Sequence, residues 1–420
     1  MSKNHRYLVD RRGRPFLLVG DSPQSLVGNL SLHEAARFIA DRRAAGFNTL
    51  LIDVLCASYT GCRPNGTTYD GIQPFERSGD LSTPDPAYFD RVAAVVRLAS
   101  KAGMAVFLDP IETGGWLPVL RVNGPAVDRA YGRFLGRRFG KFENVVWISG
   151  NDFQTWRNPA DDAVVLAVAR GIRSTDRTAL QTTELDYLTS SSHDDPRWSS
   201  LLDLDAAYTY SPTYAEVLAA YDHEPVAPVF LAEAGYEFEQ NMPSLSEGVP
   251  AILRRQEYWT MLSGATGQFY GNHFTWQFAD GWSSHLDTVG SRELGYLAKL
   301  FGGLRWWTLV PDQAHRVVTE GYGTFARTGN VGSSDYVTTA AARDGSLSVS
   351  YLPEGGRVVV DTLRFRGPVQ ASWFDPTNGT YRSVPGSPFL RGGRTAFTAP
   401  TVNHGGGKDW VLVLESPTRR

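Results

Sequence analysis

The sequence has only two cysteines, Cys56 and Cys62, in 420 residues. So few exclude a disulfide-built scaffold, and neither has the neighbouring His or Cys of a zinc site. We expect free thiols, although an oxidising compartment would allow them to pair. The sequence has no run of 18 apolar residues, so no membrane span is expected. It also has no apolar segment before the first strand, so no signal peptide is expected. As it stands, the sequence predicts a cytoplasmic protein, or a secreted one if a signal has been removed.

Several catalytic and binding motifs are also missing. There is no G-x-S-x-G elbow, no Walker A loop and no dinucleotide fingerprint. The eight histidines are scattered, and only His273 falls at a predicted strand end, so neither a metal site nor a cofactor is expected. The net charge of −3 gives no reason to expect a nucleic-acid or membrane-surface partner.

What is present is a globular composition, with 42% hydrophobic and 20% charged residues. The length suits one domain of about 250 to 300 residues followed by a smaller one. Residues 1–308 show short apolar runs that alternate with helical periodicity, which indicates βα units. Eight such strands are predicted, at residues 16–21, 49–54, 104–110, 144–152, 178–184, 204–210, 227–237 and 266–278.

Eight βα units predict a (β/α)₈ barrel. The first helix begins with a capping box at Ser31 and Glu34, and others are expected over 86–100 and 290–301. The main rival is a doubly wound open sheet, which would usually carry a Gly-rich phosphate turn after its first strand. The segment "GDSPQSLVG" at that position is not such a turn.

After residue 308 the helical periodicity of the sequence disappears. Alternating strands such as "SLSVSYL", "RVVVDTL" and "WVLVLES" are separated by Gly-rich turns, which predicts an antiparallel β-sandwich over residues 309–420. The short linker and the pair Trp306 and Trp307 indicate that the sandwich packs on the barrel in a structural role. Trp373, among its expected exposed aromatics, is more typical of a core residue than of a sugar-binding one.

Acidic residues close most of the predicted barrel strands. Strands of a barrel point their carboxyl ends to one face, where barrel enzymes place their chemistry. Any one of these acids could instead be a strand-end cap, and Asp53, Asp109 and Glu184 are the weakest functional candidates. The acids are Asp21, Asp53, Asp109, Asp152, Glu184, Glu233 and Glu237.

A set of acidic residues at the strand ends, without a predicted metal site, favours glycoside hydrolysis, because that reaction uses two carboxylates. Asp152 ends the fourth strand and Glu233 the seventh, so the two could flank a bond across the barrel mouth. Asp152 follows Asn151, whose amide could bind a sugar hydroxyl, and Tyr236 lies near enough to Glu233 to donate a hydrogen bond to it. Such unlike surroundings can separate two pKa values into one acid and one ionised nucleophile.

The chain also resembles the DUF4038 group of clan A-like glycoside hydrolases, which includes family 140, the apiosidases. The resemblance covers nearly the whole chain. Its C-terminal part is similar to the β-domain that carries a collagen-binding label in that family. It rests on "GRPFLLVGDSPQSL", "FIADRRAAGFNTLLI", "FENVVWISGND", "VFLAEAGYE", "GATGQFYGNHFTWQF" and "SWFDPTNGTY".

The resemblance implies a role for individual residues. Asp152 matches the acid/base, Glu233 the nucleophile and Asp21 a carboxylate that binds the sugar in the −1 subsite. Trp276 looks like the aromatic platform after the last strand. The sequence departs from the family pattern at Asn151 and Ala234, where Gly and Pro are usual. Further substrate-binding candidates are Asn151, Tyr210, Tyr236, Glu237 and His273.

The expected function is therefore an exo-acting, retaining glycoside hydrolase. Long loops at 54–85 and 184–200 could close the face into a pocket, and the family implies a terminal furanosyl sugar such as apiose. The alternatives are a furanosidase for arabinofuranose or a similar sugar, and a catalytically inactive barrel that only binds carbohydrate. A carbohydrate is the expected partner, and the oligomeric state is left open.

Overall fold

The computed structural model describes residues 1–154, 157–185 and 188–416. Residues 186 and 187 of the predicted loop 184–200 lie outside this part of the chain. The chain divides into two compact units. One consists of Met1–Leu17, Thr209–Gln268 and Val289–Arg420, and the other of Leu18–Tyr208 and Phe269–Thr288.

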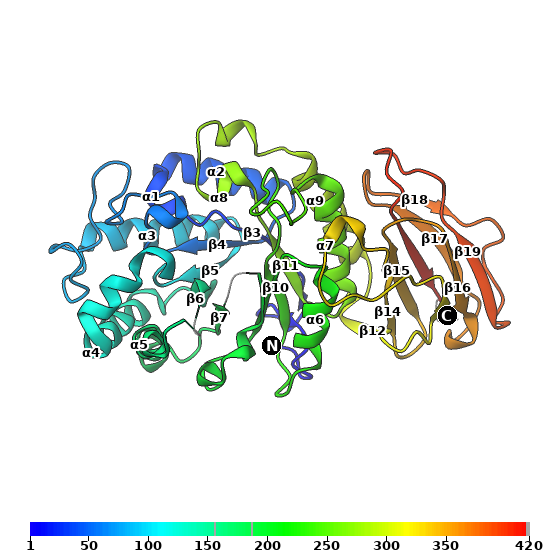
Figure 1. Ribbon diagram of the computed structural model, residues 1–420, viewed down its shortest axis with the longest axis horizontal. Coiled ribbons are helices and arrows are strands. Elements are labelled where there is room, and N and C mark those ends of the chain that lie inside the picture. The colour runs from blue at the N-terminus through cyan, green and yellow to red at the C-terminus, as the bar shows by residue number, and fades with distance from the viewer. Residues whose placement is uncertain (155–156, 186–187, 417–420) are drawn as a thin grey trace. The chain divides into compact units, whose positions relative to one another are not determined.

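The predicted (β/α)₈ barrel is confirmed by a nine-stranded sheet with the order β7-β6-β5-β4-β3-β11-β10-β9-β8 (Figure 1). Read as a ring, this order follows the chain, whereas a doubly wound sheet reverses its order at a switch point. Neighbouring strands from β3 to β7 are parallel. The strands are β3 (Leu18–Asp21), β4 (Thr49–Asp53), β5 (Ala105–Asp109), β6 (Val145–Phe153), β7 (Gln181–Leu185), β8 (Thr189–Ser190), β9 (Asp205–Thr209), β10 (Val229–Glu233) and β11 (Gly267–Tyr270), and a short ribbon, β1 (Leu8–Val9) with β2 (Pro15–Phe16), precedes them.

The helices begin where local capping signals place them. In α2, Ser31 and Glu34 form the predicted capping box. Asp85 caps α3, with Pro86 at the first helical position. The long helix α4 is kinked at Gly124, whose φ is 77°. The helices are α1 (Leu26–Asn29), α2 (Leu32–Ala44), α3 (Pro86–Lys101), α4 (Thr113–Phe139), α5 (Pro159–Thr175), α6 (Thr213–Asp222), α7 (Pro250–Leu262), α8 (His273–Trp276) and α9 (Val289–Gly303).

The prediction for the eighth barrel strand is wrong in its second half. The strand β11 ends at Tyr270, and His273–Trp276 form the single turn α8 instead of continuing the strand. Asn272 caps this turn, because its side-chain oxygen accepts a hydrogen bond from the Phe274 amide at 2.9 Å. A cap of this kind competes with strand extension, and the alternating sequence pattern hid it.

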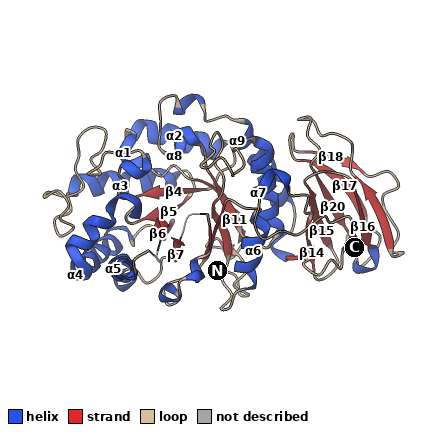
Figure 2. Ribbon diagram, in the orientation of Figure 1, coloured by secondary structure: helices blue, strands red, loops and turns tan. Residues whose placement is uncertain are grey.

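The predicted antiparallel sandwich is also present (Figure 2). Its sheets have the orders β12-β14-β15-β20-β17-β18 and β13-β16-β19. They share one core, to which Val358, Phe397 and Leu412 belong. Trp373 is 3% exposed, so the expectation that it is exposed is wrong, and it belongs to this core. The strands are β12 (Leu309–Pro311), β13 (Val318–Glu320), β14 (Thr338–Ala342), β15 (Leu347–Leu352), β16 (Arg357–Asp361), β17 (Gln370–Asp375), β18 (Thr380–Ser383), β19 (Arg394–Thr398) and β20 (Trp410–Glu415).

The sandwich packs on helix α7 within the same compact unit, as the sequence predicts. Tyr258 stacks on Tyr351 with ring centroids 4.9 Å apart. The indole of Trp259 donates a hydrogen bond to the Tyr336 carbonyl oxygen at 3.0 Å. These contacts bury large aromatic surfaces, which are among the strongest stabilising contributions in a core. The boundary between residues 308 and 309 remains a prediction.

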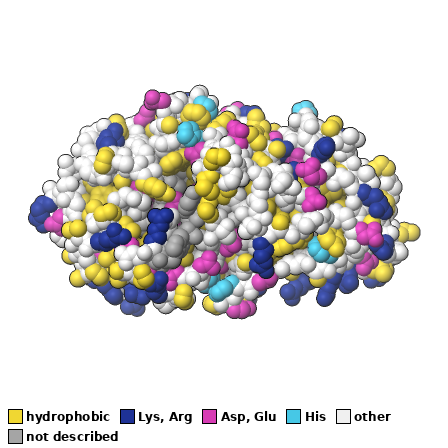
Figure 3. Space-filling model, in the orientation of Figure 1, with side chains coloured by type: hydrophobic (Ala, Val, Ile, Leu, Met, Phe, Trp, Pro, Cys, Tyr) yellow, Lys and Arg dark blue, Asp and Glu magenta, His cyan; other side chains and the backbone are white. Residues whose placement is uncertain are grey.

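Two surface properties complete the description. No helix in the described part of the chain is long and apolar enough to cross a membrane. On the face drawn in Figure 3, basic and acidic side chains are interspersed among hydrophobic and neutral ones.

Candidate active site

Strand β6 ends in a bulge that re-aims its last polar side chains. The φ angles are 133° at Gly150, 54° at Asn151 and 61° at Asp152, and the pairing with β7 shifts its register across these residues. A Cβ atom at Gly150 would lie 2.1 Å from the Glu184 carbonyl oxygen, so glycine is required there. Non-glycine residues with positive φ are uncommon and cluster at functional sites. The "SGND" sequence therefore distorts the strand just before its last residue, Phe153, and breaks the regular alternation at Asp152.

The Asp152 carboxylate has two phenolic partners. Tyr59 donates a hydrogen bond to its Oδ2 atom, and Tyr208 is a second side-chain donor. Burial raises the pKa of Asp152, and the bonds from Tyr59 and Tyr208 lower it in part. Its Oδ1 atom and the Nδ2 atom of Asn151 have no hydrogen-bond partner within the described residues. Unpaired buried polar atoms of this kind call for an explanation.

Tyr59 lies in the loop that Cys56 and Cys62 close. These cysteines form a disulfide, so the expectation of free thiols is wrong. Six residues of separation suffice for the two sulfur atoms to meet, because the loop turns through the 3₁₀ helix Ser58–Thr60. Helix α1 makes room for the pair at Gly28, where a Cβ atom would lie 2.7 Å from the Cys56 sulfur.

The same loop is anchored to Glu112, a residue that the sequence analysis missed. The carboxylate of Glu112 accepts hydrogen bonds from the Ala57 amide at 2.7 Å and from the Thr60 hydroxyl at 3.2 Å. It also caps helix α4 by accepting from the Gly115 amide. Burial raises its pKa to about 7, and the charge of Asp152 contributes to the rise. The signal was present in "DPIETGG", an acid just beyond a strand end and three residues before Gly115.

The three weakest candidates join Glu112 in a buried group of acids. Burial raises the pKa of Asp109 to about 8. Burial, together with the charges of Asp109, Glu112 and Glu184, raises the pKa of Asp53 well above its usual value. All four side chains are at most 2% exposed. Burial of this kind favours the protonated forms of Asp53 and Asp109. Among the described residues, no group of three or more His, Cys, Asp or Glu is arranged to hold a metal ion.

Asp21 is buried at the end of β3 against a cation. Its Oδ2 atom accepts a hydrogen bond from the Arg42 Nε atom, and neither side chain is exposed. Arg42, from helix α2, also donates to the Leu286 carbonyl oxygen at 2.6 Å. Asp21 Oδ1 accepts a bond from the Ser22 amide at 2.8 Å. This network holds Asp21 in place, and its direct contact with a sugar stays a prediction.

Glu233 closes strand β10 and is held from both sides. Its Oε1 atom accepts a hydrogen bond from the Tyr210 hydroxyl at 2.7 Å, and its Oε2 atom accepts one from the Tyr236 hydroxyl at 2.6 Å. Asn241 in turn donates to the Tyr210 oxygen at 2.5 Å. The bond from Tyr236 is the one that the sequence analysis expected, and the structure adds Tyr210 as a second donor. Two donated hydrogen bonds fix the orientation of the carboxylate.

Glu237 caps a helix at the same end of the unit. It is 1% exposed, and its Oε1 atom accepts a hydrogen bond from the Gly290 amide at 3.0 Å, in the first turn of α9. A negative charge at a helix N-terminus is stabilised by the helix dipole. A Cβ atom at Gly290 would lie 2.8 Å from the Glu237 carboxyl carbon, so the close approach depends on glycine.

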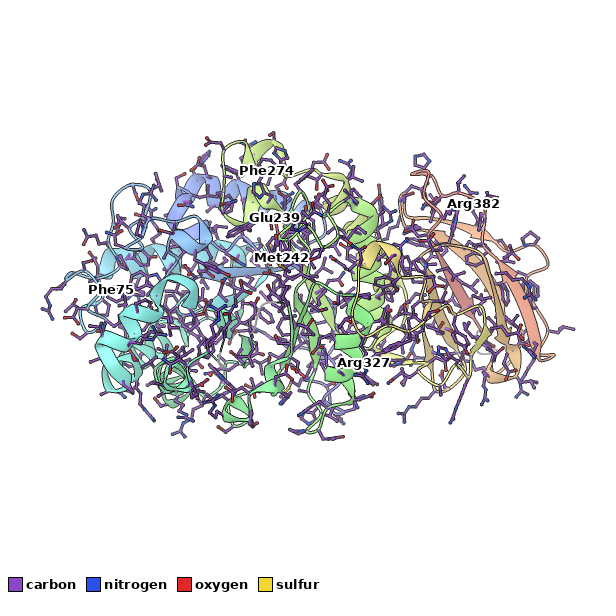
Figure 4. The ribbon with its side chains drawn as sticks, in the orientation of Figure 1. Phe75, Glu239, Met242, Phe274, Arg327 and Arg382 are labelled. Carbon is purple, nitrogen blue, oxygen red and sulfur yellow. A yellow bond between two sulfur atoms is a disulfide. The ribbon has the colours of Figure 1, made fainter. Side chains whose placement is uncertain are left out.

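The last two candidates lie on the short helix α8 and are half-buried. The ring of His273 packs edge-on against Phe274, with centroids 5.1 Å apart, and Phe274 stacks on His285. Phe274 is labelled in Figure 4. The backbone oxygen of Trp276 accepts hydrogen bonds from the Ser25 amide and hydroxyl, at 3.1 and 3.2 Å. These bonds tie α8 to the segment that follows β3.

Comparison with known families identifies the chain. A model of the family described as "Apiosidase-like, catalytic domain" matches residues 2–308. The chain belongs to this family. A second model, described as "Putative collagen-binding domain of a collagenase", matches residues 328–415. The resemblance to the apiosidases that the sequence predicted is therefore confirmed, and the protein is a glycoside hydrolase of the apiosidase-like family.

Solved structures share the fold of this apiosidase-like chain. One, titled "Glycoside hydrolase", is 20% identical with a TM-score of 0.85, and the match covers 100% of this chain and 97% of that one. Another, titled a glycoside hydrolase family 5 from Bacteroides vulgatus, is 21% identical with a TM-score of 0.85, covering 100% and 93%. No curated protein matches the chain.

Proposed function

We propose that this apiosidase-like protein is a retaining, exo-acting glycoside hydrolase that removes a terminal furanosyl sugar such as apiose or arabinofuranose. Asp152 is the acid/base and Glu233 the nucleophile. The observation that carries the proposal is that each carboxyl group lies at the carboxyl end of a barrel strand and is held by two tyrosine hydroxyls. Tyr59 and Tyr208 hold Asp152, and Tyr210 and Tyr236 hold Glu233. Burial raises the pKa of Asp152, which favours the protonated form that an acid needs.

In the proposed reaction, the Glu233 carboxylate attacks the anomeric carbon while Asp152 gives its proton to the leaving glycosidic oxygen. The bond between sugar and leaving group breaks, and a glycosyl ester on Glu233 forms. The Asp152 carboxylate then takes a proton from water, whose oxygen attacks the same carbon. This step releases the sugar with retained configuration and restores both side chains.

Substrate binding is assigned to the polar and aromatic groups around the two carboxyls. Asn151 offers an Nδ2 donor without a partner in the described chain. Tyr210 and Tyr236 contact Glu233 and would lie next to the bound sugar. Asp21, Glu237, His273 and Trp276 complete the proposed set, with Trp276 as the apolar platform. The furanosyl preference is supported by the family alone, and the disulfide supports action in an oxidising compartment.

The experiment compares aryl and natural glycosides. Asp152→Ala should slow hydrolysis of substrates with poor leaving groups by about 100-fold or more, and nitrophenyl glycosides far less, because the latter need no proton on the leaving oxygen. Glu233→Ala should abolish both reactions. An NMR time course on β-apiofuranosyl and α-arabinofuranosyl substrates should show the retained anomer first.

Two results would reject the proposal. Equal losses on both substrate classes would remove Asp152 from the acid/base role. If no glycoside is cleaved but sugars bind, the protein would be the inactive carbohydrate-binding barrel instead.

A further inference from the structure

A cavity of about 590 Å³ lies at the far end of strands β10 and β11 from Glu233. Its lining includes Val226 and Ala265, which precede β10 and β11 in the chain, together with the N-terminal segment and the start of the sandwich. All of its lining residues belong to one compact unit. Barrel enzymes work at the carboxyl ends of their strands, so this cavity is separate from the candidate active site. Its volume falls within the range of about 300 to 1,000 Å³ that small-molecule sites occupy.

Aromatic side chains form part of the cavity wall. Tyr7 and Trp306 pack edge to face with centroids 6.0 Å apart, and Trp306 packs against Trp307 at 6.4 Å. Trp306 is 7% exposed and held in place, whereas Trp307 is half-buried. Tryptophan and tyrosine present an apolar face with a polar tip, which suits the mixed surface of a sugar ring.

The cavity also carries positive charge that no described carboxylate neutralises. The Arg6 guanidinium lies over the Tyr221 ring, 3.9 Å from its centroid. Gly264 also packs closely against this ring, because a Cβ atom there would lie 2.3 Å from a Tyr221 ring carbon. Arg343 is exposed at the rim, and neither arginine forms an ion pair within the described residues.

The one acid in the lining is already engaged. Asp344 pairs with Arg366 at 3.3 Å, outside the cavity lining. The guanidinium groups of Arg6 and Arg343 therefore leave the cavity with a net positive character. Guanidinium groups match the planar, two-oxygen geometry of a carboxylate better than lysines do.

We propose that this cavity is a second carbohydrate site that binds an oligosaccharide bearing a carboxylate. A sugar ring stacks on Trp307, and its carboxylate lies between Arg6 and Arg343. The choice of a sugar over another anion rests on the proposed function, because a glycoside hydrolase gains from holding its substrate chain at a second place, and the carboxylate follows from the two arginines. The second attachment raises the local concentration of substrate without adding any contact at the reacting bond.

Calorimetric titration of the full chain tests this site directly. The probes are trigalacturonate, neutral cellotriose and inorganic phosphate. We expect trigalacturonate to bind, cellotriose to bind at least tenfold more weakly, and phosphate not to compete. Trp307→Ala and Arg343→Gln should each weaken trigalacturonate binding about tenfold or more. Arg327→Gln removes the same charge from an exposed position of the same unit and should leave the affinity unchanged (Figure 4).

A substitution in the candidate active site distinguishes the cavity from the catalytic site. Glu233→Ala should leave the affinity for trigalacturonate unchanged, even though it abolishes the proposed hydrolysis. Loss of binding in Glu233→Ala would place the ligand at the active site and overturn the proposal. Unchanged binding in both Trp307→Ala and Arg343→Gln, equal affinity for cellotriose, or no binding of trigalacturonate would overturn it as well. If every glycoside resists hydrolysis while trigalacturonate still binds as described, only the proposed function fails.

Discussion

The hydroxyl of Tyr59 offers a direct test of Asp152 as the proposed acid/base. It donates a hydrogen bond to Asp152 and so lowers the pKa that burial raises. Tyr59→Phe removes the donor and should raise the pKa of Asp152. Because Asp152 must be protonated to act as the acid, the alkaline limb of kcat/KM should move to higher pH, by several tenths of a pH unit or more.

A tyrosine of the sandwich provides the matched control for Tyr59→Phe. Tyr381 is 51% exposed, and its hydroxyl has no hydrogen-bond partner among the described residues. Tyr381→Phe should leave the pH profile of kcat/KM unchanged. An alkaline limb that stays in place in Tyr59→Phe would contradict the role assigned to this hydroxyl.

The buried acid Asp109 should make the protein less stable as the pH rises. Its folded pKa is about 8, above the unfolded value of 3.8, so the folded state binds more protons between these two values. The free energy of unfolding therefore falls across this window as the pH increases. Asp109→Asn cannot ionise, and we expect its Tm at pH 8 to exceed that of the parent by about 2 °C or more, with a smaller difference near pH 5.

The exposed Asp344 serves as the comparison for Asp109. Its pKa is lowered by the hydrogen bond from Ser346, so its ionisation is complete below the tested window. Asp344→Asn should have the same pH dependence of Tm as the parent between pH 5 and 8. A parent Tm that rises over this range would show that Asp109 is ionised in the folded protein.

The bulge at the end of β6 is an element whose shape depends on one glycine. Gly150→Ala places a Cβ atom 2.1 Å from the Glu184 carbonyl oxygen at a φ of 133°. We expect a loss of about 1 to 3 kcal/mol in the free energy of unfolding, together with loss of hydrolysis, because Asp152 would be displaced. Urea denaturation and kcat/KM on an aryl glycoside measure the two effects.

The control for this substitution lies near the end of α9. Nothing lies within 4 Å of the position that a Cβ atom would take at Gly302. Gly302→Ala should therefore be neutral or slightly stabilising. If Gly150→Ala were as stable and as active as Gly302→Ala, the bulge would not set the position of Asp152.

The loop closed by Cys56 and Cys62 is a second element with a measurable role. Replacing both residues with serine frees a short loop, and chain entropy alone predicts a loss of about 2 kcal/mol. The loop carries Tyr59 and binds Glu112 through Ala57 and Thr60, so the alkaline limb of kcat/KM should shift in the same direction as in Tyr59→Phe. Thiol titration of the native protein should find no reactive cysteine, and two free thiols would contradict the disulfide.

A buried network of ion pairs connects helix α7 to the sandwich. Arg254 donates to Asp409 at 2.7 Å and to Glu293 at 2.6 Å, and all three side chains are buried. Arg254→Ala leaves two buried acids without their cation. We expect a cost of about 3 to 5 kcal/mol in the free energy of unfolding, measured by chemical denaturation.

Arg327→Ala is the control for this connection, since Arg327 is exposed and its substitution should change the free energy of unfolding by less than about 0.5 kcal/mol.

The structural role of the sandwich also predicts the effect of removing it. A chain that ends at residue 308 exposes Tyr258 and Trp259, which pack on the sandwich, and should lose solubility. A truncated chain that stays monodisperse and fully active would show that the sandwich is not needed for the barrel.

Local signals made much of the architecture predictable. The capping box at Ser31 and Glu34 placed the start of α2, and apolar runs placed β4, β5 and β6 within about two residues. These features depend on neighbours in the sequence, so periodicity and caps reveal them. The carboxyl groups Asp152 and Glu233 were visible for the same reason, because each directly follows or closes an apolar strand.

Most of the hydrogen-bond partners of the carboxyl groups could not be predicted, because they come from residues that are close in space but not in the sequence. Tyr59 meets Asp152 across 93 residues, and Arg42 reaches Asp21, at the end of strand β3, from helix α2. No sequence spacing encodes such contacts, and the strength of burial that raises the pKa of Asp109 exists only once the chain has folded around it. By itself the sequence determined the barrel, the sandwich and the acids at the strand ends. The tertiary structure alone decided the disulfide, the donors on each carboxylate and the protonation of the buried acids, because these follow from long-range proximity and exclusion of water.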